Sequence, residues 1–260
     1  MMKTEQLRTI LEQHQLWISS QGKQGIQAKM QRVKIPKTDL NGRILDQIHF
    51  EYADLWKSNL NNTSLISAHL EEAFLERSHL EGGMLKYAYL ENANLWGADL
   101  RSANLEGARL ERCHLESANL NKTIFIKARM IETLLTDAYL VDANLEGANL
   151  EEAGLVGTNL MKANFKDSIL REANLRNANA QFACFENANL ERSNLAHTLM
   201  QFANLKGVNF HMAHLINTNF ASANLEETNL NQAYIENCFY NEQTQFPTDF
   251  IPMHYSFIQI

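Results

Sequence analysis

A strict five-residue pattern of apolar positions runs through most of the chain. From Leu40 to Tyr240, every position divisible by five is apolar. Thirty of these 41 residues are Leu and six are Phe, and the others are Met130, Ala180, Met200, Ile235 and Tyr240. Two positions earlier the residue is small (Ala, Ser, Thr, Cys or Gly) in all cases except Arg43, Ile48 and Val208. No insertion or deletion breaks this register, so we expect one continuous body.

A period of five fits neither a regular helix nor a flat strand. A step of five residues rotates a helix by about 140°, which would scatter the leucines around the cylinder. In a strand, successive leucines would point to opposite faces. A small residue and a leucine two positions apart do share one side of a short extended segment, and the chain must then turn a corner. Repeated corners predict a flat-sided coil, with successive coils stacked through backbone hydrogen bonds.

The motif A(N/D)LXX, repeated in ENANLWGADLRSANLEGARLE (residues 91–111), resembles the pentapeptide-repeat family. The resemblance covers about four-fifths of the chain and implies an all-β solenoid, a right-handed quadrilateral β-helix with four pentapeptides per coil. Residues twenty apart then stack in columns. About ten coils at the usual strand spacing of about 4.8 Å would form a rod about 50 Å long. The flanking sequences LxxxLxxHxxW and QTQFPTDFIP are similar to those of bacterial, notably cyanobacterial, members.

The ends of such a rod need caps, since an open solenoid exposes its core and unpaired backbone. Residues 4–21 predict an amphipathic helix that ends near Gly22, with Leu7, Ile10, Leu11, His14, Trp17 and Ile18 at helical spacing. We therefore expect an N-terminal capping helix and turn (1–27), a repeat β-helix (28–242) and an aromatic C-terminal cap or tail (243–260). The tail MHYSFIQI either folds back on the last coil or pairs, as an edge strand, with the tail of a second copy in a homodimer.

One position in the predicted core is undersized. Ala180 stacks between Leu160 and Met200 in the column of central residues. This predicts a small cavity or a local bend, unless a neighbour such as Phe182 turns inward.

Composition narrows the classes of function. The formal net charge of −7 argues against a protein that binds nucleic acid directly by neutralising phosphates. No run of eighteen apolar residues predicts a membrane span. The N-terminus MMKTEQLRTILEQHQ lacks the apolar region of a signal peptide, so the expected location is the cytoplasm. Cys113, Cys184 and Cys238 have neither CxxC nor metal-ligand spacing, which favours free thiols.

The outward columns carry the candidate functional residues. One column, here called the acidic column, contains Glu51, Glu71, Glu91 and Glu111, and like charges stacked at about 5 Å repel one another. We expect it to bind a partner protein. The predicted contacts are Glu51, Glu71, Glu72 and Glu91 as electrostatic contacts and Trp56, Phe74 and Trp96 as anchors, since aromatic residues often anchor interfaces. The alternative is that these glutamates are ordinary soluble surface residues.

A second candidate is an apolar belt at residues 123–141, TIFIKARMIETLLTDAYLV. Its outward apolar residues would form an association patch only if they were contiguous. We expect them to be scattered over the four sides of one coil instead.

The chain shows little sign of catalysis. We find no nucleophile with its base and no glycine-rich phosphate loop, so we expect neither an enzyme nor a cofactor. His49 and His69 stack beside Glu51 and Glu71, which makes a metal-binding enzyme the third hypothesis. We expect all four side chains to be exposed and without supporting contacts, which argues against it.

The leading prediction is thus a non-catalytic protein-interaction rod with an unidentified partner. The alternative comes from the resemblance, because some pentapeptide-repeat proteins mimic duplex DNA, bind DNA gyrase or topoisomerase IV and protect them from inhibitors. The quinolone-resistance branch has loops that project from its coils, whereas this register has none. Lysines are also interleaved with the glutamates on several columns, for example Lys166 and Lys206.

Overall fold

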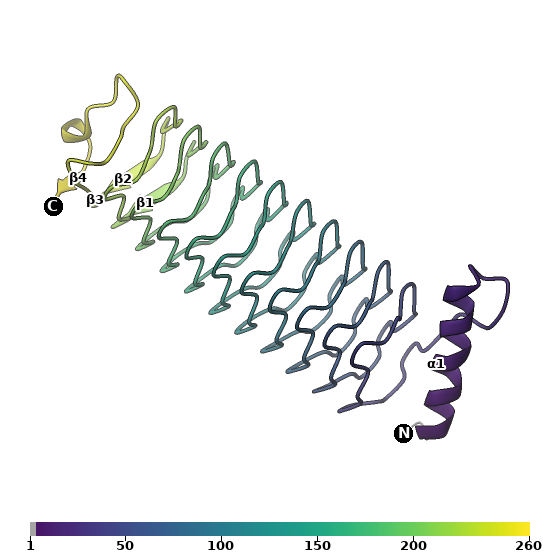
Figure 1. Cartoon of the computed structure of the whole chain (residues 1–260). Coiled ribbons are helices and arrows are strands. Elements are labelled where there is room, and N and C mark those ends of the chain that lie inside the picture. The colour runs from purple at the N-terminus through teal and green to yellow at the C-terminus, as the bar shows by residue number, and fades with distance from the viewer. Residues whose placement is uncertain (1–3) are drawn as a thin grey trace.

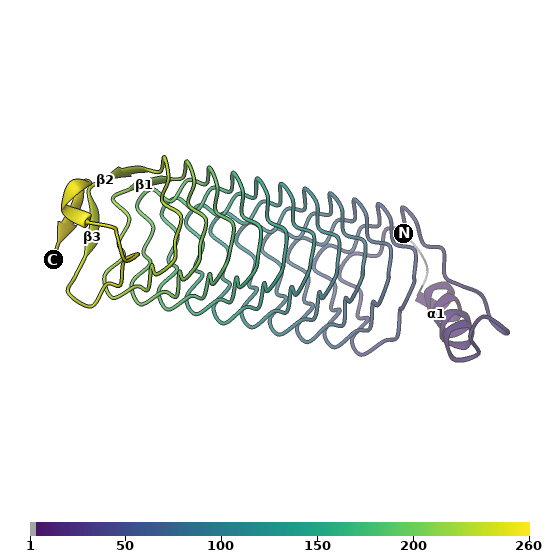
Figure 2. The same cartoon turned by 90° about the horizontal axis from the view of Figure 1, so that it is seen from above.

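The chain forms an elongated four-sided solenoid with a helix at one end and an irregular aromatic segment at the other (Figure 1). The computed structural model describes residues 4–260. The helix that begins the described chain and the C-terminus lie at opposite ends of the rod (Figure 2). In the column that begins at Lys29, ten successive parallel bridges in steps of 20 residues lead to Asn229. The expectation of about ten coils is therefore confirmed.

The backbone of each pentapeptide forms most of its hydrogen bonds with the neighbouring coils, as residues 93–97 illustrate. Asn94 donates to the preceding coil, whereas Leu95 and Gly97 donate to the following coil, at 2.8–2.9 Å. Ala93 N–H closes the corner by donating to the carbonyl three residues earlier. Trp96 N–H donates to the side-chain Oδ1 of Asn94 at 3.1 Å. The preference for Asn or Asp at this position follows, because its side chain caps the N–H two residues later.

The corners require an unusual backbone conformation. The second residue after each central residue has a positive φ at every repeat from Arg32 to Asn237, between 51° and 62° where it is not glycine. Valine, isoleucine, threonine and proline do not occur at these positions. Branched side chains and the proline ring fit this left-handed conformation poorly, so their absence follows from the backbone.

The core is a continuous stack of central side chains. The central residues from Leu40 to Leu225 are all buried, and nearly all of the small residues two positions earlier are buried with them. Arg43 is exposed at the N-terminal end. Ala180 is completely buried. Phe182 points outward, 51% exposed, and stacks on Phe202, so it does not turn inward to fill the space beside Ala180.

The N-terminal helix α1 (Thr4–Ser19) lies across the first coil. Its buried residues are Leu7, Leu11 and His14. His14 Nδ1 accepts a hydrogen bond from Ala28 N–H at 3.2 Å, which joins the helix to the start of the solenoid. Among the described residues, no helix is long and apolar enough to cross a membrane.

Short regular strands occur only near the C-terminus of the described chain. Strand β1 (His214–Ile216) pairs in parallel with β2 (Tyr234–Glu236), and β3 (Cys238–Tyr240) pairs in parallel with β4 (Phe257–Gln259). A 3-10 turn, η1 (Pro252–His254), precedes β4. The tail therefore folds back on the last coil, which was one of the two alternatives. Stacked and edge-on rings fill this end of the rod: Tyr240, Phe246, Phe250, Tyr255 and Phe257.

Candidate functional site

The candidate site lies on two adjoining sides of the N-terminal half. Face 1 contains the pentapeptides centred on Phe50, Leu70, Leu90 and every twentieth residue, and face 2 contains those centred five residues later. On face 1, the residues before the central position stack into a ladder. The rings of His49 and His69 are 4.5 Å apart and within 2° of parallel, and Tyr89 continues the stack at 4.6 Å.

The acidic column runs beside this ladder, and its first two carboxylates turn toward the imidazoles. Glu51 Oε1 lies 2.8 Å from His49 Nδ1, and Glu71 Oε1 lies 3.1 Å from His69 Nδ1. Both imidazoles therefore direct the same nitrogen toward the acidic column.

The next two carboxylates of the acidic column, Glu91 and Glu111, form ion pairs with arginines instead. Glu91 pairs with Arg109 Nε at 2.7 Å, and Glu111 pairs with Arg129 Nε at 2.6 Å. The guanidinium of Arg109 also lies 5.5 Å from the centre of the Tyr89 ring. The mutual repulsion expected along the acidic column is thus offset in its C-terminal part by arginines from the neighbouring ladder.

The carboxylates of the acidic column are recessed. Their side chains are 13–30% exposed, and one oxygen of each, Oε2, is buried without a hydrogen-bond partner. Burial is the main cause that raises the pKa of Glu91 above its usual value, and the charge of Arg109 opposes the shift.

The two histidines are recessed as well. The side chains of His49 and His69 are 22% and 31% exposed. The expectation that these imidazoles and their glutamates are all exposed is therefore wrong. Each carboxylate folds back over the residue two positions earlier, and each ring is covered on at least one side by its neighbour in the stack.

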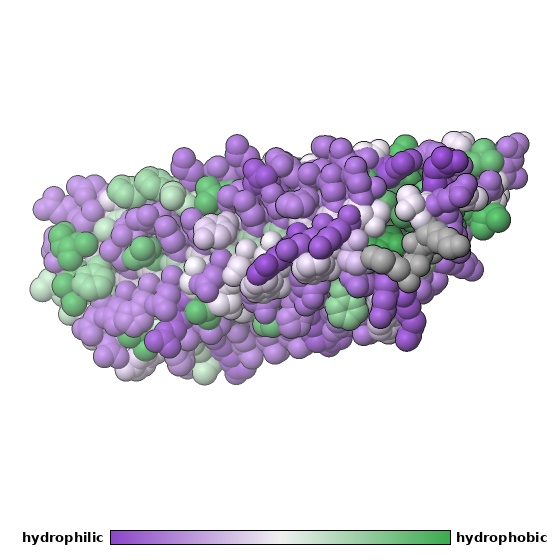
Figure 3. All heavy atoms as spheres, turned by 90° about the horizontal axis from the view of Figure 1, so that it is seen from below, coloured by the Kyte–Doolittle hydropathy of each residue, from purple (hydrophilic) through white to green (hydrophobic). Residues whose placement is uncertain are grey.

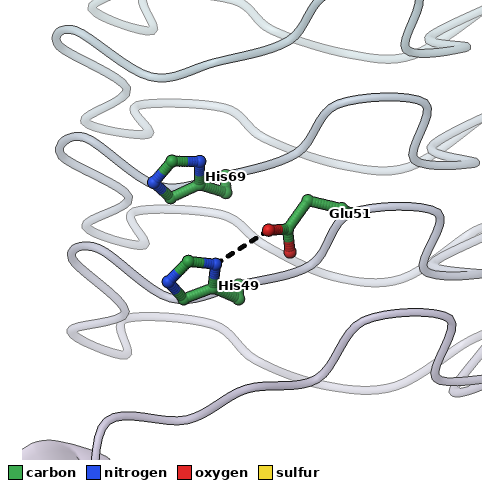
Figure 4. Close-up of side chains that lie close together, drawn as sticks. All are labelled: His49, Glu51 and His69. Carbon is green, nitrogen blue, oxygen red and sulfur yellow. Dashed lines mark hydrogen bonds and ion pairs between the residues drawn. The ribbon is translucent and has the colours of Figure 1, made fainter.

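Three of these side chains approach one another closely enough to share an ion. One possible ligand atom from each of His49, Glu51 and His69 lies within 4.8 Å of the others. Figure 4 shows the Glu51 carboxylate beside the two stacked rings, to which it extends from the following corner. Imidazole nitrogen and carboxylate oxygen are common ligands of Zn²⁺.

The predicted aromatic anchors lie on face 2. Phe74 and Trp96 are 48% and 41% exposed, whereas Trp56 is half-buried. The ammonium groups of Lys37 and Lys57 lie 5.1 Å and 4.6 Å from the centre of the Trp56 ring. Trp56 is therefore held by two lysines. The guanidinium of Arg77 lies 4.7 Å from the centre of the Trp96 ring, but Phe74 and Trp96 are the more exposed anchors.

A shallow hollow lies beside the anchors, two of which line it. Its volume is about 410 Å³, and its lining residues are Lys34, Pro36, Tyr52, Asp54, Trp56, Phe74 and Glu76. Glu72, which was predicted as an electrostatic contact, accepts a hydrogen bond from the Tyr52 hydroxyl at 3.0 Å. The predicted residues therefore form two neighbouring groups, one recessed and acidic, the other aromatic.

The other candidates do not converge on one place. The apolar residues of the belt at 123–141 follow one coil around all four sides, with Leu134 and Tyr139 exposed on different faces. Hydrophobic residues gather at the two ends of the rod and are scattered between them on the side shown in Figure 3. Sequence reasoning missed the exposed stack of Phe182 on Phe202, although a spacing of twenty residues predicts that they are neighbours.

The sequence comparison identifies the family. The sequence model of pentapeptide repeats matches eight times, over residues 44–82 and 85–239, which is most of the chain. The chain belongs to the pentapeptide-repeat family. This family folds as a right-handed quadrilateral β-helix, and the pentapeptide-repeat protein described here has that fold. No curated protein sequence matches it.

Several solved pentapeptide-repeat structures are similar. HetL from the cyanobacterium Nostoc, involved in regulating heterocyst differentiation, is 25% identical over 92% of this chain and 97% of its own, with a TM-score of 0.41. A thylakoid-lumen protein of Arabidopsis thaliana is 26% identical over 37% and 68%, with a TM-score of 0.37. QnrB1, a plasmid-mediated fluoroquinolone resistance protein, is 12% identical over 88% and 91%, with a TM-score of 0.44. None of these likenesses by itself indicates a partner.

Proposed function

We propose that this pentapeptide-repeat protein is a non-catalytic rod that binds a partner protein through faces 1 and 2 of its N-terminal half. A general role in protein interaction fits the family. The observation that supports this particular surface is the exposure of Phe74 and Trp96 beside a shallow hollow and the acidic column. Large aromatic side chains bury much area for little loss of conformational freedom, which makes them effective anchors.

The two groups of side chains have different roles in this proposal. The aromatic residues Phe74 and Trp96 make direct contact, since they are 48% and 41% exposed. The recessed carboxylates of the acidic column contribute mainly through their field, because their Oε2 atoms are inaccessible. We therefore expect a partner segment with apolar side chains and a positive charge nearby.

A comparison of two matched double variants tests the proposal. Phe74→Ala with Trp96→Ala removes the predicted anchors. Phe182→Ala with Phe202→Ala removes an equally exposed aromatic pair from the C-terminal half. Affinity capture from a lysate of the native host, followed by mass spectrometry, should recover a partner with the wild type and the second variant but not with the first. Equal recovery by both variants would refute the assignment of the surface.

The alternative, that the rod imitates duplex DNA for a gyrase or topoisomerase, requires uncompensated rows of negative charge. Several columns compensate their charge instead. Lys166 pairs with Glu186 at 2.9 Å, and Arg171 pairs with Glu151 at 2.8 Å. The same capture experiment addresses this alternative, since gyrase or topoisomerase subunits recovered only by proteins with intact faces 1 and 2 would favour it.

We also propose that the C-terminal end associates with a second copy. Strand β4 uses one edge to pair with β3, which leaves its other edge at the end of the rod. Ile251, Met253, Ile258 and Ile260 are 42–83% exposed around it. An unpaired strand edge with apolar neighbours favours pairing with another chain.

A further inference from the structure

Two coils of face 1 bring two imidazoles and a carboxylate together at one place. His49 and His69 occupy equivalent positions in successive coils and are joined by a parallel β-bridge. Glu51 reaches the same place from the corner that follows His49 (Figure 4). The rigid solenoid fixes the spacing of the three backbones, so the group is largely assembled before any ligand binds.

The donors suit a divalent transition-metal ion. Two imidazoles and one carboxylate form a ligand set of Zn²⁺ sites, with bond lengths of about 2.0–2.2 Å. In a tetrahedral site, ligand atoms then lie roughly 3.3 Å apart. The separations within the group reach up to 4.8 Å, so side-chain rotations must bring the ligand atoms closer together when the ion binds. A water can occupy the fourth position.

The charges along the acidic column also favour a cation here. Glu91 and Glu111 each have an arginine, whereas the side-chain partners of Glu51 and Glu71 are imidazoles. A neutral imidazole offers a carboxylate only a hydrogen bond. A divalent ion would supply the charge that Arg109 and Arg129 supply further along.

The environment supports both kinds of ligand. Oε2 of Glu51 and Oε2 of Glu71 are buried without a hydrogen-bond partner, which leaves acceptor capacity of each carboxylate unsatisfied. Each imidazole already turns Nδ1 toward the acidic column, where the carboxylates lie. The stacked Tyr89 ring supports His69 from the other side and limits its rotation.

We propose that His49, Glu51 and His69 form a Zn²⁺-binding site that links two successive coils. This inference does not rest on the proposed interaction surface, because the three ligands lie together whether or not a partner binds the aromatic anchors of face 2. The bound ion stabilises the N-terminal coils, since a ligand that binds only the folded state shifts the unfolding equilibrium.

Titration of the full-length, tag-free and metal-stripped protein with ZnCl₂ by isothermal calorimetry tests the site. We expect one strong Zn²⁺ equivalent for the wild type. His49→Ala and His69→Ala should each weaken binding by about tenfold or more, as should Glu51→Gln. Co²⁺ bound in place of Zn²⁺ should show the visible absorption of a tetrahedral complex and lose it in the same variants.

The matched control is His114→Ala. His114 forms the same type of pair, with Glu116 at 3.3 Å, but its column has no second histidine in the adjacent coils, where Asn94 and Leu134 lie. Binding should be unchanged in this variant. Circular dichroism checks that every variant remains folded. Alanine is acceptable at position 114 because Gly154 occupies an equivalent position in the same column. Absence of a strong equivalent in the wild type, or equal binding by the His49→Ala, His69→Ala double variant, would overturn the proposal.

Discussion

At the scale of single residues, four of the five positions of the pentapeptide have a distinct structural role. The central residue fills the core, the small residue fits beside it, and Asn or Asp caps the following corner. The positive φ at the second corner residue then excludes β-branched side chains and proline. The first two roles were predicted from the sequence. The absence of β-branched residues and proline at the second corner residue can be read from the sequence, but only the positive φ found in the structure explains it.

Ala180 is the smallest of the central residues and fills its core position least. It occupies a central position where the coils on either side have Leu160 and Met200. Ala180→Leu should add buried apolar volume and raise the free energy of unfolding by about 1–2 kcal/mol. Chemical denaturation measures the change, with Leu160→Ala as the control that should lose about 2–5 kcal/mol. A loss of stability in Ala180→Leu would mean that the backbone has already closed around the alanine.

The single residues of the candidate site were harder to predict than the core. Their columns followed from the spacing of twenty, so the proximity of His49, His69 and the acidic column was expected. Their burial was not, because it depends on how each glutamate side chain bends over the residue two positions earlier. The sequence specifies where an outward side chain starts but not which neighbour it reaches.

At the scale of elements, α1 is joined to the solenoid by a histidine that must remain neutral. His14 is completely buried, and burial is the main cause that holds its pKa below the usual value. The titratable groups near it are Asp46, which opposes the shift, and His49, which adds to it. Its Nδ1 accepts the hydrogen bond from Ala28, so this nitrogen cannot carry a proton.

The stability of the cap should therefore depend on pH. Below about pH 6.5 the unfolded chain binds a proton at His14 that the folded chain resists, so stability is lost as the pH falls. We expect Tm to decrease from about pH 7.5 to 5.5, and to decrease less in His14→Gln. Thermal unfolding in buffer with a chelator measures both proteins. Identical pH dependence in the two would show that His14 makes no contribution.

The end elements show where sequence reasoning becomes less informative. The helix was predicted from its own periodicity, and α1 covers Thr4–Ser19. The C-terminal segment has no period, so its two possible fates remained open. The parallel pairing of β3 with β4 depends on contacts between aromatic residues far apart in the sequence, such as Tyr240 and Phe257.

At the scale of the whole molecule, the two ends differ in how well they are closed. The helix lies across the N-terminal end, whereas β4 leaves a strand edge at the other (Figure 1). The proposed self-association follows from this difference. Light scattering coupled to size-exclusion chromatography should show a dimer that becomes a monomer in Ile258→Lys with Ile260→Lys.

A control separates a specific effect from a general gain in charge. Ile169 is also exposed, at 39%, but it lies in the middle of the rod. Ile169→Lys should leave the dimer intact. A wild type that is monomeric at all concentrations would exclude self-association through the tail.

Because the register is uninterrupted, the number of a repeat residue determines its position on the rod. Dividing the number of any repeat residue by twenty gives its height along the axis from the quotient and its side of the square from the remainder. Duplication of one coil would lengthen the molecule and leave every column in line. Loss of a single pentapeptide would instead turn everything beyond it by a quarter of a revolution. If that pentapeptide lay between His49 and His69, His69 would no longer lie above His49. A surface composed of columns thus tolerates changes in length only in whole coils.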